Sequence, residues 1–135
     1  MAARPGRKVK FVKAQVGRAS ERVCQAFVEV EHASGERFVG TAEGTASEPA
    51  SLECTAEATL RALCQAVEGD ERGFQLRGIE TVRALGGKSL VVVELSVTHE
   101  GETRGLLGVA AVGSDPARAA ALAVLSAANR FLGVG

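Results

Sequence analysis

Two histidines and three cysteines are the side chains best suited to acid–base, nucleophilic or metal chemistry in this chain. His32 and His99 fall at corresponding hairpin turns, without acidic or thiol partners at the spacing of metal ligands. A turn also rarely supplies the burial and the hydrogen-bonded partner that a general base needs. We therefore expect two exposed turn residues, and neither a metal nor a cofactor.

The cysteines Cys24, Cys54 and Cys64 cannot all pair within one chain, and their spacing matches no zinc pattern. Free cysteine packs as a small hydrophobic residue, and thiols stay reduced in the cytoplasm. The sequence therefore predicts buried, unpaired thiols in a reducing compartment.

A glycine-rich stretch over residues 83–89 superficially resembles a phosphate-binding loop. It lacks the first glycine at the required distance, and a valine-rich strand rather than a helix follows Lys88 and Ser89. We interpret it as a hairpin connection. Since no serine lies in a nucleophile elbow either, we expect no enzymatic activity.

The charges are unevenly placed although they sum to zero. Before Val23 there are seven cations and one acid, Glu21; the cations are Arg4, Arg7, Lys8, Lys10, Lys13, Arg18 and Arg22. A basic arm on an acidic body is typical of a nucleic-acid contact. A solvated tail followed by a polar-faced strand gives the same pattern, and the absence of Trp and Tyr disfavours base stacking. Nucleic-acid binding remains the alternative.

The length of 135 residues fits one domain, and 46% apolar residues are enough for a core. No apolar run approaches the ~20 residues that a membrane helix needs, and the run over residues 90–93 has the length of a strand. The N-terminal residues lack the apolar region of a signal peptide. These features favour a cytoplasmic protein without a membrane segment.

The expected elements follow one order twice. After a tail over residues 1–8, period-two patterns predict strands over 8–16, 22–31 and 37–42, then a small-residue loop over 44–49 and a helix over 50–67 with Pro49 in its first turn. A polar loop over 68–73 follows. The second set comprises strands over 74–85, 88–98 and 103–112, and a helix from Pro116 to about Leu132, capped by Asp115 and stopped by Gly133.

The two halves also match in residue types. The segment through His32, Gly35 and Gly40 corresponds to the segment through His99, Gly101 and Gly108, and a proline-led, alanine-rich helix follows each. Two units of this length are too few for a solenoid. We predict an α+β fold made of a duplicated βββα unit, with antiparallel strands packed against two helices and pseudo-repeats over about 9–68 and 74–132.

The second helix is apolar around most of its circumference. From Ala119 to Leu132 the polar exceptions are Ser126, Asn129 and Arg130. One sheet covers one face of a helix, so a second subunit is a natural cover for the rest. Alanine serving as a helix former at the surface is the alternative. We expect a homodimer.

The segment from Asp115 to Leu132, with its alanine-rich helix and its Ala-Asn129-Arg130 ending, resembles the close of the C-terminal regulatory domain of 2-isopropylmalate synthase. The resemblance implies a duplicated βββα domain that dimerises and binds an end-product amino acid near the loops before the helices. The first of these loops departs from the family pattern because it has no Asp, and in the second only Asp115 matches. The family's catalytic barrel is absent.

The candidate ligand site is therefore the pair of loops that open the helices. Their residues are Gly44, Thr45 and Ser47 in one unit and Gly113, Ser114 and Asp115 in the other. Backbone N–H groups at a helix start can hold a small carboxylate or an amino acid, although ordinary capping uses the same donors. The sequence favours a non-catalytic, homodimeric metabolite-binding or regulatory module; the alternatives are nucleic-acid binding and a structural subunit that partners an enzyme.

Overall fold

A computed structural model describes residues 9–67 and 73–134, and it confirms the predicted α+β fold with a duplicated βββα unit. The elements are β1 (Val9–Arg18), β2 (Val23–His32), β3 (Arg37–Thr45), α1 (Glu48–Ala66), β4 (Gly73–Arg83), β5 (Ser89–His99), β6 (Glu102–Ala111) and α2 (Pro116–Val134). The tail over residues 1–8 and most of the polar loop after α1 lie outside the described residues. In the described part, no helix is long and apolar enough to cross a membrane.

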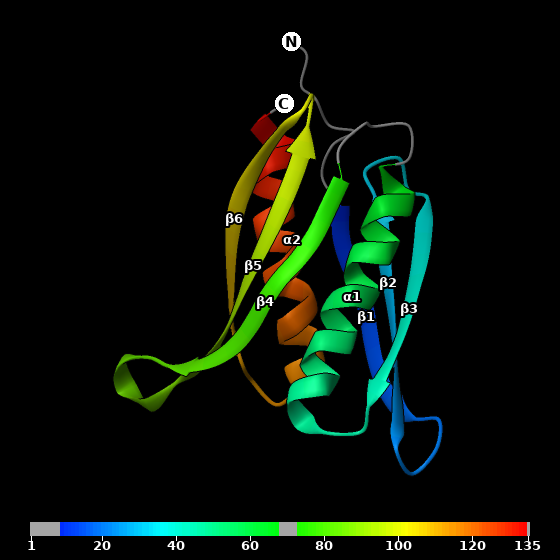
Figure 1. Ribbon diagram of the computed structural model, residues 1–135, viewed down its shortest axis with the longest axis vertical. Helices are drawn as coiled ribbons and strands as arrows, with labels where there is room; N and C mark the ends of the chain where they lie inside the picture. Colours follow the sequence, from blue (N-terminus) through cyan, green and yellow to red (C-terminus); the bar gives the residue numbers. More distant parts are fainter. Residues whose placement is uncertain (1–8, 68–72, 135) are drawn as a thin grey trace.

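The strands form two antiparallel sheets, ordered β1-β2-β3 and β4-β5-β6, and the helices lie side by side between them (Figure 1). Helix α1 packs mainly on β2 and β3, and α2 on β5 and β6. The helices also contact each other, and each one reaches an edge strand of the opposite unit: α1 contacts β4 and α2 contacts β1. The result is a three-layer arrangement with one shared core.

Alternation along the central strands explains why each sheet turns one face to the helices. Every second residue of β2 and β5 is buried while its neighbours are half-buried or exposed, as expected for a strand with one covered face. The buried rows are Cys24, Ala26, Val28 and Val30 in β2, and Val91, Val93, Leu95 and Val97 in β5.

The duplication extends to irregularities in the strands. A β-bulge interrupts β1 between Phe11 and Lys13, and another interrupts β4 between Leu76 and Gly78. Both bulges follow an apolar residue that pairs with a buried residue of the central strand. Because a bulge is a specific feature of a strand, its recurrence at the matching position supports a repeat of structure as well as of sequence.

The pairing registers correct one correspondence that the sequence indicates. Val9, the first residue of β1, pairs with His32, whereas Phe74, near the start of β4, pairs with Val97. His32 therefore corresponds to Val97, because the β5–β6 hairpin extends farther than the β2–β3 hairpin. Both histidines end a strand and are half-buried, so the expectation of exposed turn residues is also wrong.

Two glycines allow the helices to approach the sheets closely. A Cβ atom at Gly40 of β3 would collide with the backbone of Ala58 in α1, and one at Gly108 of β6 with the backbone of Ala123 in α2. The alanines that face these strands keep the helix surface thin at the contact. The small residues of the helices are thus explained by the narrow space between the two sheets.

The helices also bind the free backbone carbonyls of the outer edge strands. Gln65 of α1 donates to the carbonyl oxygen of Val39 at 2.8 Å, and Arg130 of α2 donates to that of Leu107. Val39 and Leu107 each precede the close-contact glycine of their strand. An unpaired strand edge invites further pairing, so these bonds partly protect β3 and β6.

Asn129 joins the two units. Its side-chain oxygen accepts a hydrogen bond from the backbone N–H of Val9 at 3.0 Å, and its side-chain amide donates to the carbonyl of Val9 at 2.8 Å. Cys64 of α1 makes the corresponding contact, a hydrogen bond with the backbone of Phe74 at the start of β4. The Asn-Arg ending that prompted the family resemblance therefore holds β1 through Asn129 and β6 through Arg130.

The structure changes the argument for a second subunit. The over-apolar surface of α2 is covered within one chain by β5, β6, β1 and α1. From the sequence we expect one sheet to cover one face of α2, whereas α2 in fact lies between two sheets. The helix also passes through Gly133, the predicted stop, and ends at Val134. The apolar character of α2 therefore no longer supports a homodimer.

Replacing Gly108 with Ala tests the close helix–sheet contact. The new methyl group would have to displace α2 from β6, and overpacking of this kind costs about 1–3 kcal/mol. We expect Gly108→Ala to lower the free energy of unfolding by about 2 kcal/mol, measured by urea denaturation. Gly105→Ala on the same strand is the control, since the nearest atom to its Cβ would be 3.8 Å away. Equal stability of the two variants would contradict the contact.

Replacing Asn129 with Ala tests the link between the units. The change leaves the N–H and the carbonyl of Val9 without their partners, and each unsatisfied group costs about 1–3 kcal/mol when water cannot replace the bond. We expect a loss of about 2 kcal/mol in unfolding experiments and faster amide exchange in β1. Ser126→Ala on the exposed side of α2 should change neither quantity. An Asn129→Ala protein as stable as this control would show that the link is dispensable.

Candidate functional site

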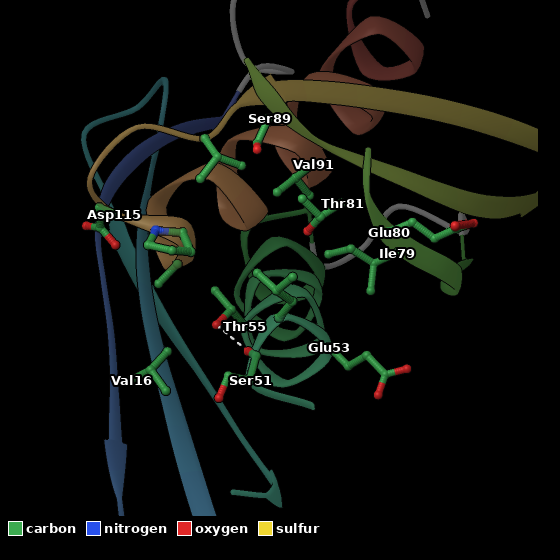
Figure 2. Close-up of a pocket in the computed structure, with 14 residues that line it drawn as sticks. Val16, Ser51, Glu53, Thr55, Ile79, Glu80, Thr81, Ser89, Val91 and Asp115 are labelled. Carbon is green, nitrogen blue, oxygen red and sulfur yellow. Dashed lines mark hydrogen bonds between the residues drawn. The ribbon is translucent and has the colours of Figure 1, made fainter. Parts of the chain in front are cut away.

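A cavity of about 780 Å³ opens where both helices begin. Ser51 and Leu52 from the first turn of α1 line it, together with Pro116 and Ala117 from the first turn of α2. The ends of the two hairpins close its sides, with Val16 from β1 and Thr81 from β4 (Figure 2). The cavity therefore uses matching parts of the two units.

The interior of the cavity combines aliphatic and hydroxyl groups. Ile79, Val91 and Val112 supply apolar surface, and Thr81 and Ser89 supply hydroxyl groups from β4 and β5. Two further hydroxyls, from Ser51 and Thr55, donate to backbone carbonyls of α1, at 2.9 Å to Ser47 and 2.8 Å to Ser51 respectively. The wall can thus contact an apolar group and still hydrogen-bond a polar one.

The charged side chains along the cavity are all acidic. Asp115 lies at one side and Glu53 at the other, whereas the Glu80 side chain points away, toward the outer face of β4 (Figure 2). Among the described residues that line the cavity there is no Lys, Arg or His. The electrostatic potential at the mouth therefore disfavours a simple anion and favours a ligand that carries a positive group.

The six predicted site residues do not form one site. Asp115 lines the cavity, whereas Ser47 lines a separate pocket beside Cys24, and Gly44 and Thr45 line a third between α1 and β4. Gly113 and Ser114 line none of these three. Gly44 and Thr45 belong to β3, not to the predicted loop, because the strand continues to Thr45.

Both helix starts are capped by their own side chains. The Ser47 hydroxyl accepts a hydrogen bond from the N–H of Ala50 at 3.3 Å, and the Asp115 carboxylate accepts one from the N–H of Arg118 at 3.2 Å. These are donors that a ligand carboxylate would use. The roles of Ser47 and Asp115 as caps are therefore explained without a ligand.

The strand residues of the cavity, notably Ile79, Thr81 and Ser89, are not among the site residues predicted from the sequence. Alternation in β4 would have placed Ile79 and Thr81 on the inner face, beside Val93 and Val91 of β5. These residues lie beside the helix starts only because of the way in which the two units pack. A local pattern in the sequence does not encode that packing.

The two histidines do not come together. His99 lines a small pocket with Glu102 and Arg104, and its Nε2 atom is 4.0 Å from Glu100. His32 lies beside Ser34, with Nδ1 and Oγ 3.0 Å apart, and His99 lies in the other sheet. The described residues contain no group of three or more His, Cys, Asp or Glu side chains that could hold a metal. The segment Leu85–Gly87 is a short 3₁₀ turn between β4 and β5, so the predicted hairpin connection is confirmed.

Two cysteines meet in the core. Cys24 of β2 and Cys54 of α1 are both buried, with their sulfur atoms 3.8 Å apart, and the Cys24 thiol donates to the carbonyl of Thr45 at 3.3 Å. Burial, the hydrogen bond with Cys24 and nearby negative charge raise the pKa of Cys54 to about 11. The prediction of buried thiols is wrong for Cys64, which is exposed on α1.

The described part of the basic segment does not make a continuous cationic surface. Lys10 and Lys13 lie on the outer face of β1, where Lys13 sits 5.7 Å from the ring centroid of Phe27. Glu29 and Glu31 share that face, and Arg37 pairs with both, at 3.7 and 3.2 Å. Mixed charges of this kind are typical of a solvated sheet face. They agree with the interpretation of this segment as a polar-faced strand.

No family model and no curated protein matches this sequence. The resemblance to the regulatory domain of 2-isopropylmalate synthase therefore remains a proposal; the duplicated βββα fold that it implies is present.

Proposed function

We propose that this chain is a non-catalytic regulatory module that binds a small metabolite in the cavity between its two helix starts, as its resemblance to the 2-isopropylmalate synthase regulatory domain suggests. The observation that carries the proposal is the cavity itself, formed by matching parts of both units. Its volume of about 780 Å³ lies within the range of ligand pockets, roughly 300–1,000 Å³.

An amino acid with an apolar side chain suits the lining better than a simple carboxylic acid. Ile79 and Val91 can pack against an aliphatic group, and Thr81 and Ser89 can hydrogen-bond the polar end. The carboxylates of Glu53 and Asp115 attract an ammonium group. A 2-oxo acid lacks that group and keeps the negative charge, so it should bind more weakly.

The second part of the proposal is a homodimer, for which the outer face of the second sheet provides new grounds. We call this surface the apolar face; it consists of Val82, Leu90, Val92, Leu107, Val109 and Ala111. Two exposed glutamates flank it on the same side of the sheet, Glu80 beside Val92 and Glu94 beside Leu107. Leu107 and Val109 are 57% and 48% exposed. An exposed apolar surface rimmed by charged residues is typical of a contact site.

The first sheet shows that the fold does not require this apolar face. At the corresponding positions it carries Gly17, Gln25, Phe27, Val39, Thr41 and Glu43. The row of Leu90 and Ala111 is thus polar in the sister sheet, and Thr41 replaces Val109, whereas Val92 and Leu107 have the apolar counterparts Phe27 and Val39. Because the two sheets have the same layout, the difference points to a contact made by one of them.

The size of the face limits the strength of such a dimer. Three strands of ten or eleven residues cover roughly 14 by 33 Å. Two copies packed over the whole outer sheet would bury roughly 900 Å², and packed over the apolar face alone roughly half of that, below the ~1,000 Å² expected of a specific interface. We therefore propose a weak, concentration-dependent dimer with a second copy of this chain.

A thermal-shift screen with apolar amino acids and their 2-oxo acids tests ligand binding. A ligand at a hundredfold excess over its Kd stabilises the folded state by about 2.7 kcal/mol, which raises the melting temperature by several degrees. We expect at least one apolar amino acid to produce this shift and its 2-oxo acid to produce less. A screen without any shift would contradict the proposal.

The location of binding is tested by filling the cavity. Thr81→Trp places a large side chain against the helix starts and should abolish the ligand-dependent shift. Gln75→Trp is the matched control, because Gln75 is exposed on the opposite face of the same strand and does not line the cavity. A shift that survives Thr81→Trp would place the ligand elsewhere.

The dimer is tested by sedimentation from micromolar to submillimolar concentration. We expect the wild type to show a rising average mass, and Leu107→Lys to remain monomeric because it places a charge in the apolar face. Val39→Lys is the control: Val39 occupies the matching position of the first sheet, and each lysine would lie opposite a glutamate, Glu29 or Glu94. A wild-type protein that stays monomeric throughout the range would exclude the homodimer.

A further inference from the structure

Cys24 and Cys54 bring two thiols together from different layers of the fold. Cys24 lies on the inner face of β2 and is 3% exposed; Cys54 lies on α1 and is 5% exposed. Their sulfur atoms are 3.8 Å apart and linked by a hydrogen bond. A disulfide bond needs the sulfurs at ~2.05 Å, so the two atoms have to approach by less than 2 Å to form one.

The neighbouring residues make room for this pair. Gly44, which pairs with Cys24 across the sheet, has no Cβ atom, and a Cβ there would collide with the sulfur of Cys54. Helix α1 can therefore lie close enough to β2 for its thiol to reach the sheet. The Ser51 hydroxyl also contacts the Cys24 sulfur, at 3.8 Å.

A pocket of about 290 Å³ leads to Cys24 from the surface. Val16, Ser47 and Ser51 line it together with the Cys24 side chain. It is large enough for a small peroxide to reach the sulfur of Cys24, although both thiols are almost fully covered. Val16 and Ser51 also line the large cavity, so the cysteine pair lies directly behind one wall of the candidate ligand site.

We propose that Cys24 and Cys54 form a reversible disulfide that fastens α1 to β2 and makes this wall of the cavity sensitive to oxidants. The inference does not depend on the proposed ligand, because it concerns the cysteines and the elements that carry them.

The oxidant is a small peroxide, and the reaction proceeds in two steps. The Cys24 thiolate attacks a peroxide oxygen; the O–O bond breaks, hydroxide leaves, and Cys24 becomes a sulfenic acid. The Cys54 thiolate then attacks the Cys24 sulfur, which forms the S–S bond and releases a second hydroxide. Protonation by the two thiol protons gives two waters, so each peroxide consumes two electrons from the pair. A dithiol reductant reverses the change.

Burial makes this switch slow at neutral pH. The pKa of Cys54 is raised to about 11, so only a small fraction of its thiol is ionised and able to attack. Below that pKa the thiolate fraction rises tenfold for each pH unit. We therefore expect disulfide formation to be faster at pH 9 than at pH 7.

The experiment uses the full chain with Cys64→Ser, which removes the exposed thiol that could link two molecules. After hydrogen peroxide treatment, denaturing alkylation and mass spectrometry should show a loss of two hydrogen atoms and no alkylated cysteine. Dithiothreitol should restore both thiols. Adding Cys24→Ala or Cys54→Ala to this variant should leave a single cysteine that cannot close the bond.

Two results would overturn the proposal. In one, both thiols remain open to alkylation after a treatment that joins them in the urea-unfolded protein, which serves as the control for the reagent. In the other, the mass rises by two oxygen atoms, showing that Cys24 is oxidised to a sulfinic acid before Cys54 can reach it.

Discussion

The close approach of two helices to two sheets is the constraint on which the rest of this structure depends. Both helices share one layer, so each must present small residues toward more than one neighbour. At Gly40 and Gly108 the strand has no side chain, and the facing helix has alanine, the smallest side chain, at Ala58 and Ala123. Packing at this distance produces dispersion contacts along the backbone but leaves no room for larger groups.

The shared layer also explains why the two units cannot be understood separately. Each helix packs against an edge strand of the other unit. The side chain of Asn129 on α2 bonds both the N–H and the carbonyl of Val9 in β1. A single βββα unit would expose one whole side of its helix to water. Duplication within one chain therefore replaces the cover that a second subunit would otherwise provide.

The cavity is a consequence of the same arrangement. Where the helices begin, the hairpin β1–β2 and the hairpin β4–β5 continue past them, and the space between the hairpins is only partly filled. The cysteine pair lies one layer deeper, between α1 and β2. Any ligand in the cavity and any bond between the thiols would therefore act on the first turns of α1.

The sequence alone determined the elements and their repetition. Alternation and turn residues located all six strands to within about three residues at each end, and Asp115 caps the second helix, which Pro116 opens, as predicted. These features are local, since they depend on neighbours along the chain. The resemblance through Asn129 and Arg130 also identified residues that carry structural bonds.

Only the tertiary structure decided what those elements meet. The predicted loops do not converge on one site, because Gly44 and Thr45 belong to β3 while the cavity draws on strand residues such as Ile79 and Thr81. The cover of α2, the contact between Cys24 and Cys54 and the difference between the outer faces all join residues far apart in the chain. Such contacts depend on the angle and distance at which whole layers pack, and no spacing within the sequence encodes them.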